Sequence, residues 1–243
     1  MKKLRSFFRS PMATTLLFLL AVVFLVTGTI GGVRAAPTIF NATDFDREFE
    51  LDQIGTSLVE TNAGGTNTYT GQSNTILAGL VPTGEKFAVG KAYDEELSVL
   101  NSGSIPTYVR VTIYKYWVDE NGNKMSDLKP EDIELTLLTG SDWMEDTSAR
   151  TDERTVLYYT NLLDSGDTTS PFADGIKING DVLNIVKQTN NNGVITNVRL
   201  VDGKTFTVEV EVNAVQDHSA KSAIWSVWGL SNPGNVGLSV SDN

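Results

Sequence analysis

One run of residues restricts the fold of this chain more than any other. Between Tyr108 and Val118, the apolar residues Val109, Val111, Ile113 and Trp117 lie on one face, and aromatic and β-branched residues fill much of the opposite face. A period of two is the pattern of a β-strand, and large side chains on both faces favour a strand that is packed against other elements on both sides. The run therefore predicts a central strand of a β-sheet.

Similar but weaker patterns recur along the chain, separated by Asn, Gly and Asp turns. We expect strands over residues 45–51, 54–58, 93–101, 133–138, 155–160, 175–179, 194–201 and 206–215, the last two forming a hairpin. One short C-terminal helix is predicted, with Ser219 as its cap, Gly229 as its end and an apolar stripe of Ala223, Ile224, Val227 and Trp228. Many short strands predict an all-β fold, a jelly-roll-like antiparallel β-sandwich with this helix.

The N-terminus has the parts of an export signal. Residues 1–35 begin with basic side chains, continue through an apolar run at 13–26 and end in small residues. Val33 and Ala35 satisfy the preference of signal peptidase, so we expect cleavage after Ala35, with a cut after Ala36 as the alternative. An uncleaved membrane anchor is the competing interpretation of the same run. Cleavage predicts a secreted protein.

The rest of the chain reads as one domain with a leading segment and a tail. We expect an N-terminal segment with the first strand at 36–60, a polar loop at 61–75, the sandwich and helix at 76–229, and a flexible tail at 230–243.

Charge and cysteine content limit the partners. Loss of residues 1–35 removes five of the 19 basic residues and none of the 30 acidic ones, which leaves a formal charge of −16. Such a surface repels phosphate backbones, so nucleic acid is not an expected partner. The absence of Cys excludes disulfides and suits a secreted protein of a Gram-positive bacterium.

Catalytic chemistry finds little support in the residues. The single histidine, His218, cannot supply a common zinc site, and no G-x-S-x-G motif accompanies it. The oxygen-rich stretch 119–124 resembles the start of an EF-hand loop, but a hairpin turn explains it better. The acidic groups at 94–96 and 142–146 are interpreted as solvated faces. We predict no catalytic, metal or cofactor residues.

Several segments together resemble one family. They are Gly31–Ala36, Glu95–Gly103 followed by Tyr108–Val111, and Arg154–Tyr159 before Ser165–Thr169. In order and spacing the chain is similar to the TasA and camelysin group, secreted proteins of Gram-positive bacteria that are processed by a SipW-type signal peptidase.

This resemblance implies a jelly-roll-like domain and, for the TasA branch, assembly into extracellular fibres of the biofilm matrix. Each subunit would donate the strand that follows the cut to the next subunit. The expected donor residues are Ala36, Pro37, Thr38, Ile39, Phe40, Phe45, Phe49 and Leu51. The implied partners are further copies of the chain and the signal peptidase, with an accessory matrix protein as a further candidate. A camelysin-like cell-surface metalloendopeptidase and a monomeric surface adhesin are the alternatives.

Overall fold

The computed structural model describes residues 53–71, 73–191 and 194–240, all within one compact unit. The predicted signal peptide, its cleavage residues Val33, Ala35 and Ala36, and the proposed donor residues up to Leu51 lie outside the described residues. The described chain forms antiparallel sheets with one α-helix, as the sequence predicts. None of its helices is long and apolar enough to cross a membrane.

One layer of the fold is a five-stranded antiparallel sheet. Its order is β2-β1-β4-β10-β7. The strands are β1 (Thr56–Asn62), β2 (Gly65–Tyr69), β4 (Ala92–Asn101), β7 (Ile133–Leu137) and β10 (Ala173–Ile178).

The second layer is a six-stranded antiparallel sheet in the order β3-β13-β5-β9-β8, with β6 beside β5. The strands are β3 (Ser73–Thr75), β5 (Thr107–Val118), β6 (Lys124–Met125), β8 (Trp143–Glu145), β9 (Arg154–Tyr159) and β13 (Thr205–Gln216). β5 lies between β13 and β9, so its predicted central position is confirmed.

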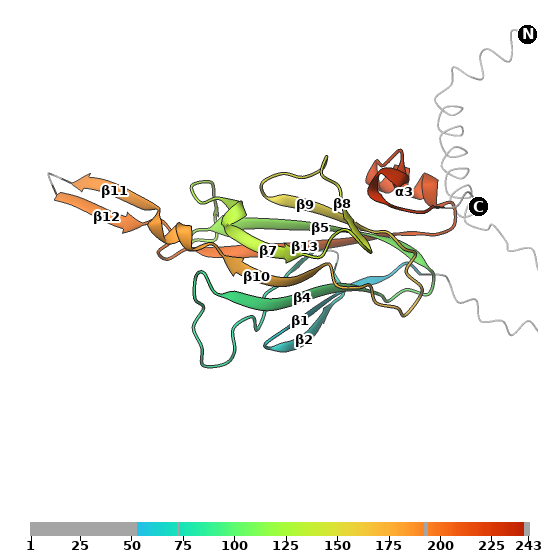
Figure 1. The fold of residues 1–243 in the computed structure, drawn as a ribbon, viewed down its shortest axis with the longest axis horizontal. Helices are drawn as coiled ribbons and strands as arrows, with labels where there is room; N and C mark the ends of the chain where they lie inside the picture. Colours follow the sequence, from blue (N-terminus) through green and yellow to red (C-terminus); the bar gives the residue numbers. More distant parts are fainter. Residues whose placement is uncertain (1–52, 72, 192–193, 241–243) are drawn as a thin grey trace, which may run out of the picture. The chain divides into compact units, whose positions relative to one another are not determined.

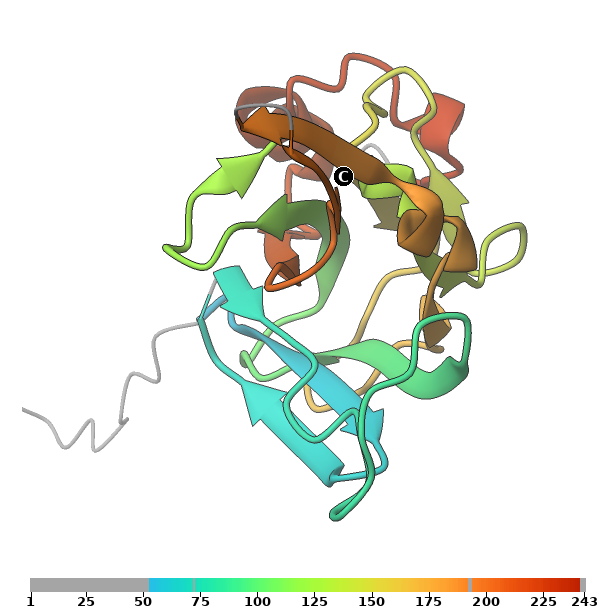
Figure 2. The same ribbon diagram turned by 90° about the vertical axis from the view of Figure 1, so that its left-hand side faces the viewer.

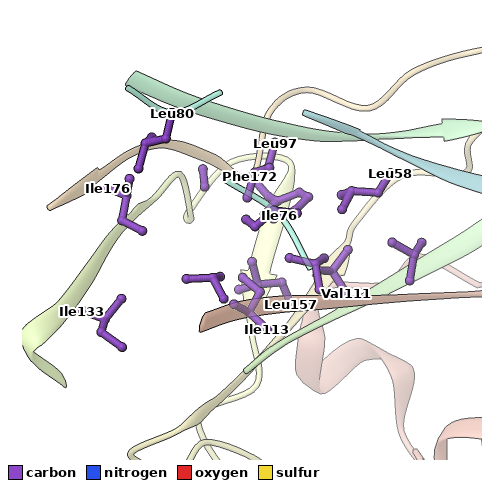
Figure 3. Close-up of a cluster of buried hydrophobic side chains, with 14 of the residues drawn as sticks. Leu58, Ile76, Leu80, Leu97, Val111, Ile113, Ile133, Leu157, Phe172 and Ile176 are labelled. Atoms are coloured by element: carbon purple, nitrogen blue, oxygen red, sulfur yellow. The ribbon is translucent and has the colours of Figure 1, made fainter. Parts of the chain in front are cut away.

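The main core lies between these two layers (Figure 1). Leu58, Leu97 and Phe172 come from the first sheet and its connections, and Val111, Ile113 and Leu157 come from the second (Figure 3). All six are almost fully buried. A smaller cluster covers the opposite face of β5 and β9, where Tyr108 and Tyr158 pack with Ile224 and Leu238. Both faces of β5 are therefore covered, which explains its apolar residues at both parities.

The predicted hairpin of 194–201 with 206–215 is wrong. β12 (Val194–Arg199) pairs instead with β11 (Val186–Asn191), in a separate two-stranded sheet that projects from the sandwich (Figure 1). Figure 2 views the strands from the end at which this hairpin lies. The chain then turns at Asp202 and Gly203 and enters the large sheet as β13, whose strand partners are β5 and β3. Two consecutive strands with a short turn thus belong to different sheets.

The polar loop predicted at 61–75 contains two strands. β2 folds back on β1 after a tight turn at Ala63 and Gly64, and β3 follows at the edge of the other sheet. The stretch lacks apolar alternation because β2 is an edge strand that is mostly exposed. Its backbone pairing, rather than its side-chain pattern, makes it a strand.

The C-terminal helix α3 spans Ala220–Trp228 and ends at Gly229, close to the prediction. The Ser219 side chain makes no capping hydrogen bond, and Val227 is 59% exposed, so the predicted cap and stripe are only partly right. The predicted flexible tail is also wrong as far as residue 240. Val236 and Leu238 are buried in the smaller cluster, and Ser239 accepts a hydrogen bond from the Tyr108 hydroxyl.

Three short 3-10 helices complete the described elements. They are η1 (Pro130–Asp132), η2 (Gly180–Asn184) and η3 (Pro233–Val236).

Candidate functional site

The two edges of β13 are paired very unequally. On one side β13 pairs with β5 along its whole length, from Thr205 opposite Val118 to Gln216 opposite Thr107. On the other side β3 covers only residues 209–211, and one further bond joins the Ile76 N–H to the Val208 C=O at 3.2 Å. In the part of the chain that the structure describes, residues 212–216 have no strand partner on this side.

The open edge presents its backbone groups outward. Along a strand, the backbone N–H and C=O groups of successive residues point to opposite edges. The C=O of Val208 points toward β3, so the N–H and C=O groups of Val212, Ala214 and Gln216 point to the same edge. The Val212 C=O accepts a side-chain hydrogen bond from Asn213 Nδ2 at 3.3 Å. Among the described residues the Ala214 backbone has no partner there. A free edge of this kind is a template for another strand.

A gap of about 330 Å³ lies beside this edge. Its walls are the start of β1, the connection from β2 to β3, residues 212–214 of β13, and α3. Ile54 and Val227 line it and are 48% and 59% exposed, so apolar side-chain surface faces the gap. The gap thus combines unpaired backbone with apolar side-chain surface.

The described chain begins next to the gap. The Gln53 N–H donates to Ser104 Oγ at 2.8 Å, and the Gln53 C=O accepts from the Ser104 N–H at 2.9 Å. The Gly103 N–H donates to the Gly55 C=O at 3.1 Å. Gly103 is required here, because an added Cβ would overlap the Gln53 carbonyl oxygen. These bonds hold residues 53–55, the start of the described chain, against the loop at 103–104.

Side-chain interactions hold the α3 wall of the gap in place. Arg110 on β5 lies over the Trp228 ring, with its guanidinium carbon 5.5 Å from the ring centroid. The Tyr158 ring meets Trp228 edge to face at 5.5 Å, and burial raises the pKa of the Tyr158 hydroxyl. The helix is therefore docked on the outer face of β5 and β9, beside the end of β13.

The residues considered for catalysis lie apart from this gap. His218 is exposed between β13 and α3. Asp119 accepts backbone hydrogen bonds from Asn121 and Asn123, which lowers the pKa of its carboxyl and forms the predicted hairpin turn. No group of three or more His, Cys, Asp or Glu residues gathers as a metal site within the described ranges. Contrary to the interpretation of 94–96 as a solvated face, Glu95 is fully buried.

The open edge of β13 was missed by the sequence analysis. The run from Phe206 to Val212 predicts a strand but gives no information about the lengths of the partner strands at its two edges. The short β3 was hidden in a polar stretch, so the mismatch in length between the two strands was not visible.

Comparison with protein-family models, curated proteins and solved structures gives no match for this chain. Its function is therefore inferred from the geometry of the chain itself.

Proposed function

We propose that this protein is a secreted structural subunit of an extracellular fibre, in which the N-terminal segment of one copy adds a strand to β13 of another. The observation that carries the proposal is the open edge at 212–216, which borders a gap that Ile54 and Val227 help to line and lies near the first described residues, 53–55. The cell-surface metalloendopeptidase and the monomeric adhesin have no comparable observation in their favour.

Strand addition needs a backbone template and pockets for alternate side chains. The outward groups of Val212, Ala214 and Gln216 supply the template, and Ile54 and Val227 supply apolar surface. Five residues of strand span about 17 Å at roughly 3.3 Å per residue. Residues 36–51 are long enough to cover that distance and carry Ile39, Phe40, Phe45 and Phe49 to place against the gap.

Cleavage of the export signal has a clear role in this arrangement. While residues 1–35 hold the segment at a membrane, its first residues cannot reach another copy. A cut after Ala35 frees Ala36 and Pro37, and Pro is compatible with the end or edge of a sheet rather than its centre. N-terminal sequencing of secreted protein tests the cut. Retention of residues 1–35 on the exported product would contradict it.

The test of assembly compares residues 36–243 with residues 46–243 by electron microscopy and light scattering. We expect fibres from the longer form only, because the shorter form lacks the first part of the donor segment. Equal fibres from both forms would contradict donation by this segment. A longer form that stays monomeric at high concentration in all salt and pH conditions would favour pairing within one chain or the adhesin alternative.

A further inference from the structure

Two fully buried carboxyl groups lie in the five-stranded sheet, away from the open edge of β13. Glu60 on β1 and Glu95 on β4 are both 0% exposed. Glu60 is opposite Leu97, and Asn62 is opposite Glu95, so the two glutamates share one face and are diagonal neighbours. Two ionised carboxylates so placed would repel each other without water to screen them.

The partners of Glu60 are those of an ionised carboxylate. One oxygen accepts from the Leu77 N–H, and the other accepts from the Tyr69 hydroxyl at 2.6 Å and from Asn67 Nδ2 at 3.3 Å. All three partners are donors, so both oxygens of Glu60 act as acceptors toward them.

The partners of Glu95 fit a protonated carboxyl. Its Oε2 accepts from Asn62 Nδ2 at 3.0 Å, while its Oε1 has no hydrogen-bond partner among the described residues. Burial, and then hydrogen bonding with Glu60, raise the pKa of Glu95 to about 8. A proton on Oε1 would satisfy the orphaned atom by donation to Glu60.

We propose that Glu60 and Glu95 share one proton and act as a pH-sensitive latch on the segment of residues 76–80. Glu60 binds the Leu77 N–H, and Asn62 Nδ2 binds both Glu95 and the Ala78 C=O, the latter at 3.1 Å. Leu77 has a left-handed φ of 84°, a strained conformation for a residue with a side chain. The latch therefore holds a strained turn in place.

The latched segment forms one wall of a large apolar cavity in the described chain. Leu77, Gly79 and Leu80 line a space of about 730 Å³ together with Trp117 and Phe206. When Glu95 loses its proton, repulsion between the two carboxylates weakens the hold on Leu77. The proposal predicts that alkaline pH loosens this wall, and it does not depend on the fibre proposal.

The charged surroundings of the pair are simple. Tyr69 from β2 is the other titratable group at the pair, and burial with Glu60 raises its pKa to about 12, so it remains a donor. The segment 76–80 carries no titratable side chain. Asp94 and Glu96 on β4 and Asp174 on β10 are exposed. Of the titratable groups at the pair, Glu95 is therefore the one whose proton we expect to be lost between pH 5 and pH 9.

The first test follows thermal unfolding of the full chain from pH 5 to pH 9, using wild type, Glu95→Gln and Glu96→Gln. The amide introduced by Glu95→Gln can donate to Glu60 at every pH, so we expect the unfolding midpoint of this variant to fall less across the range than that of wild type. The exposed neighbour Glu96 is the matched control, and its variant should follow wild type. Equal pH dependence in all three proteins would overturn the proposal.

Two further measurements use wild type, so they test the proposal even if a variant does not fold. Carbon-13 NMR of glutamate carboxyls in wild type should show one group that titrates near pH 8. As that group ionises, hydrogen exchange at the Leu77 amide should rise more steeply with pH than the intrinsic exchange rate does. Titration of every glutamate below pH 6 would overturn the proposal. Calcium binding at pH 9 that requires Glu95 would also overturn it, because the pair would then be a cation site.

Discussion

Arg110 and Asn213 lie directly opposite each other in the β5–β13 pair, and the Arg110 guanidinium donates to Asn213 Oδ1 at 2.5 Å. The same guanidinium lies over Trp228 of α3. One side chain therefore connects the strand with the open edge to the helix that forms a wall of the gap.

Replacement of Arg110 by Ala should loosen α3. The change removes a hydrogen bond and a cation–π interaction that together are worth about 1–3 kcal/mol of unfolding free energy. Urea unfolding measures the loss, and Trp fluorescence reports the release of Trp228. Arg199→Ala, on the exposed β12, is the control and should have little effect. Equal losses from both changes would rule out the bridging role of Arg110.

Ala214→Pro should abolish fibres while leaving the domain folded. The Ala214 N–H points to the open edge, so the substitution removes a donor for an added strand without breaking a bond to β5. Circular dichroism checks folding, and electron microscopy checks assembly. Normal fibres from a folded Ala214→Pro protein would mean that the added strand lies elsewhere.

Substitutions at two exposed positions on α3 can show whether assembly uses the gap or the rest of the helix surface. Val227 lines the gap, whereas Trp225, which is 64% exposed, does not. A Glu at 227 would place a charge against apolar donor side chains, so Val227→Glu should slow or prevent assembly. Trp225→Glu should assemble normally. Light scattering during assembly compares the two rates, and equal inhibition would implicate the whole helix surface instead.

Gly103→Ala should disturb the start of the described chain. The added methyl would overlap the Gln53 carbonyl oxygen and lie 2.5 Å from the Gly55 nitrogen, so residues 53–55 must move. We expect a loss of about 1–3 kcal/mol in unfolding free energy, typical of overpacking. Gly180→Ala is the matched control, since no atom lies within 4 Å of its added Cβ. Denaturant unfolding of both variants measures the difference, and equal losses would contradict the overlap.

The buried carboxyl pair predicts the sign of the pH dependence of stability. The folded state holds the Glu95 proton up to about pH 8, whereas the ordinary value is 4.5, so the folded state binds more protons between these limits. Its contribution is complete below pH 4.5 and is lost as pH rises toward 8, at roughly 1 kcal/mol per pH unit. Chemical denaturation at several pH values should show this slope in wild type minus Glu95→Gln. A slope of the opposite sign would contradict the assignment.

The strands with clear alternation were predictable. β4, β5, β7 and β9 each bury one parity of side chains in the main core, so period two located them within a few residues, whereas β10 changes parity at a bulge between Ala173 and Gly175. β2 and β3 were not, because an exposed edge strand needs backbone partners but no apolar face. The partner of β12 was mistaken because a short turn favours pairing of neighbours, whereas the long β13 is held by β5 across the sheet.

The burial of Glu95 was visible in the sequence but was misread, and that of Glu60 was not predicted. Glu95 has the same parity as Tyr93, Leu97 and Val99, which are all buried, and Glu60 has the parity of Leu58. An acidic residue in phase with an apolar face is the signal. The neighbours Asp94 and Glu96 made the stretch look like a solvated acidic run.

The position of β13 in the chain sets when the open edge can exist. Among the described strands β13 is the last to be synthesised, yet it joins β5, about 100 residues earlier, and β3, still earlier. Such distant pairings form late in folding. Until β13 has been made, the edge proposed to accept a donated strand does not exist, so a partly made chain cannot take up the proposed donor segment at this edge.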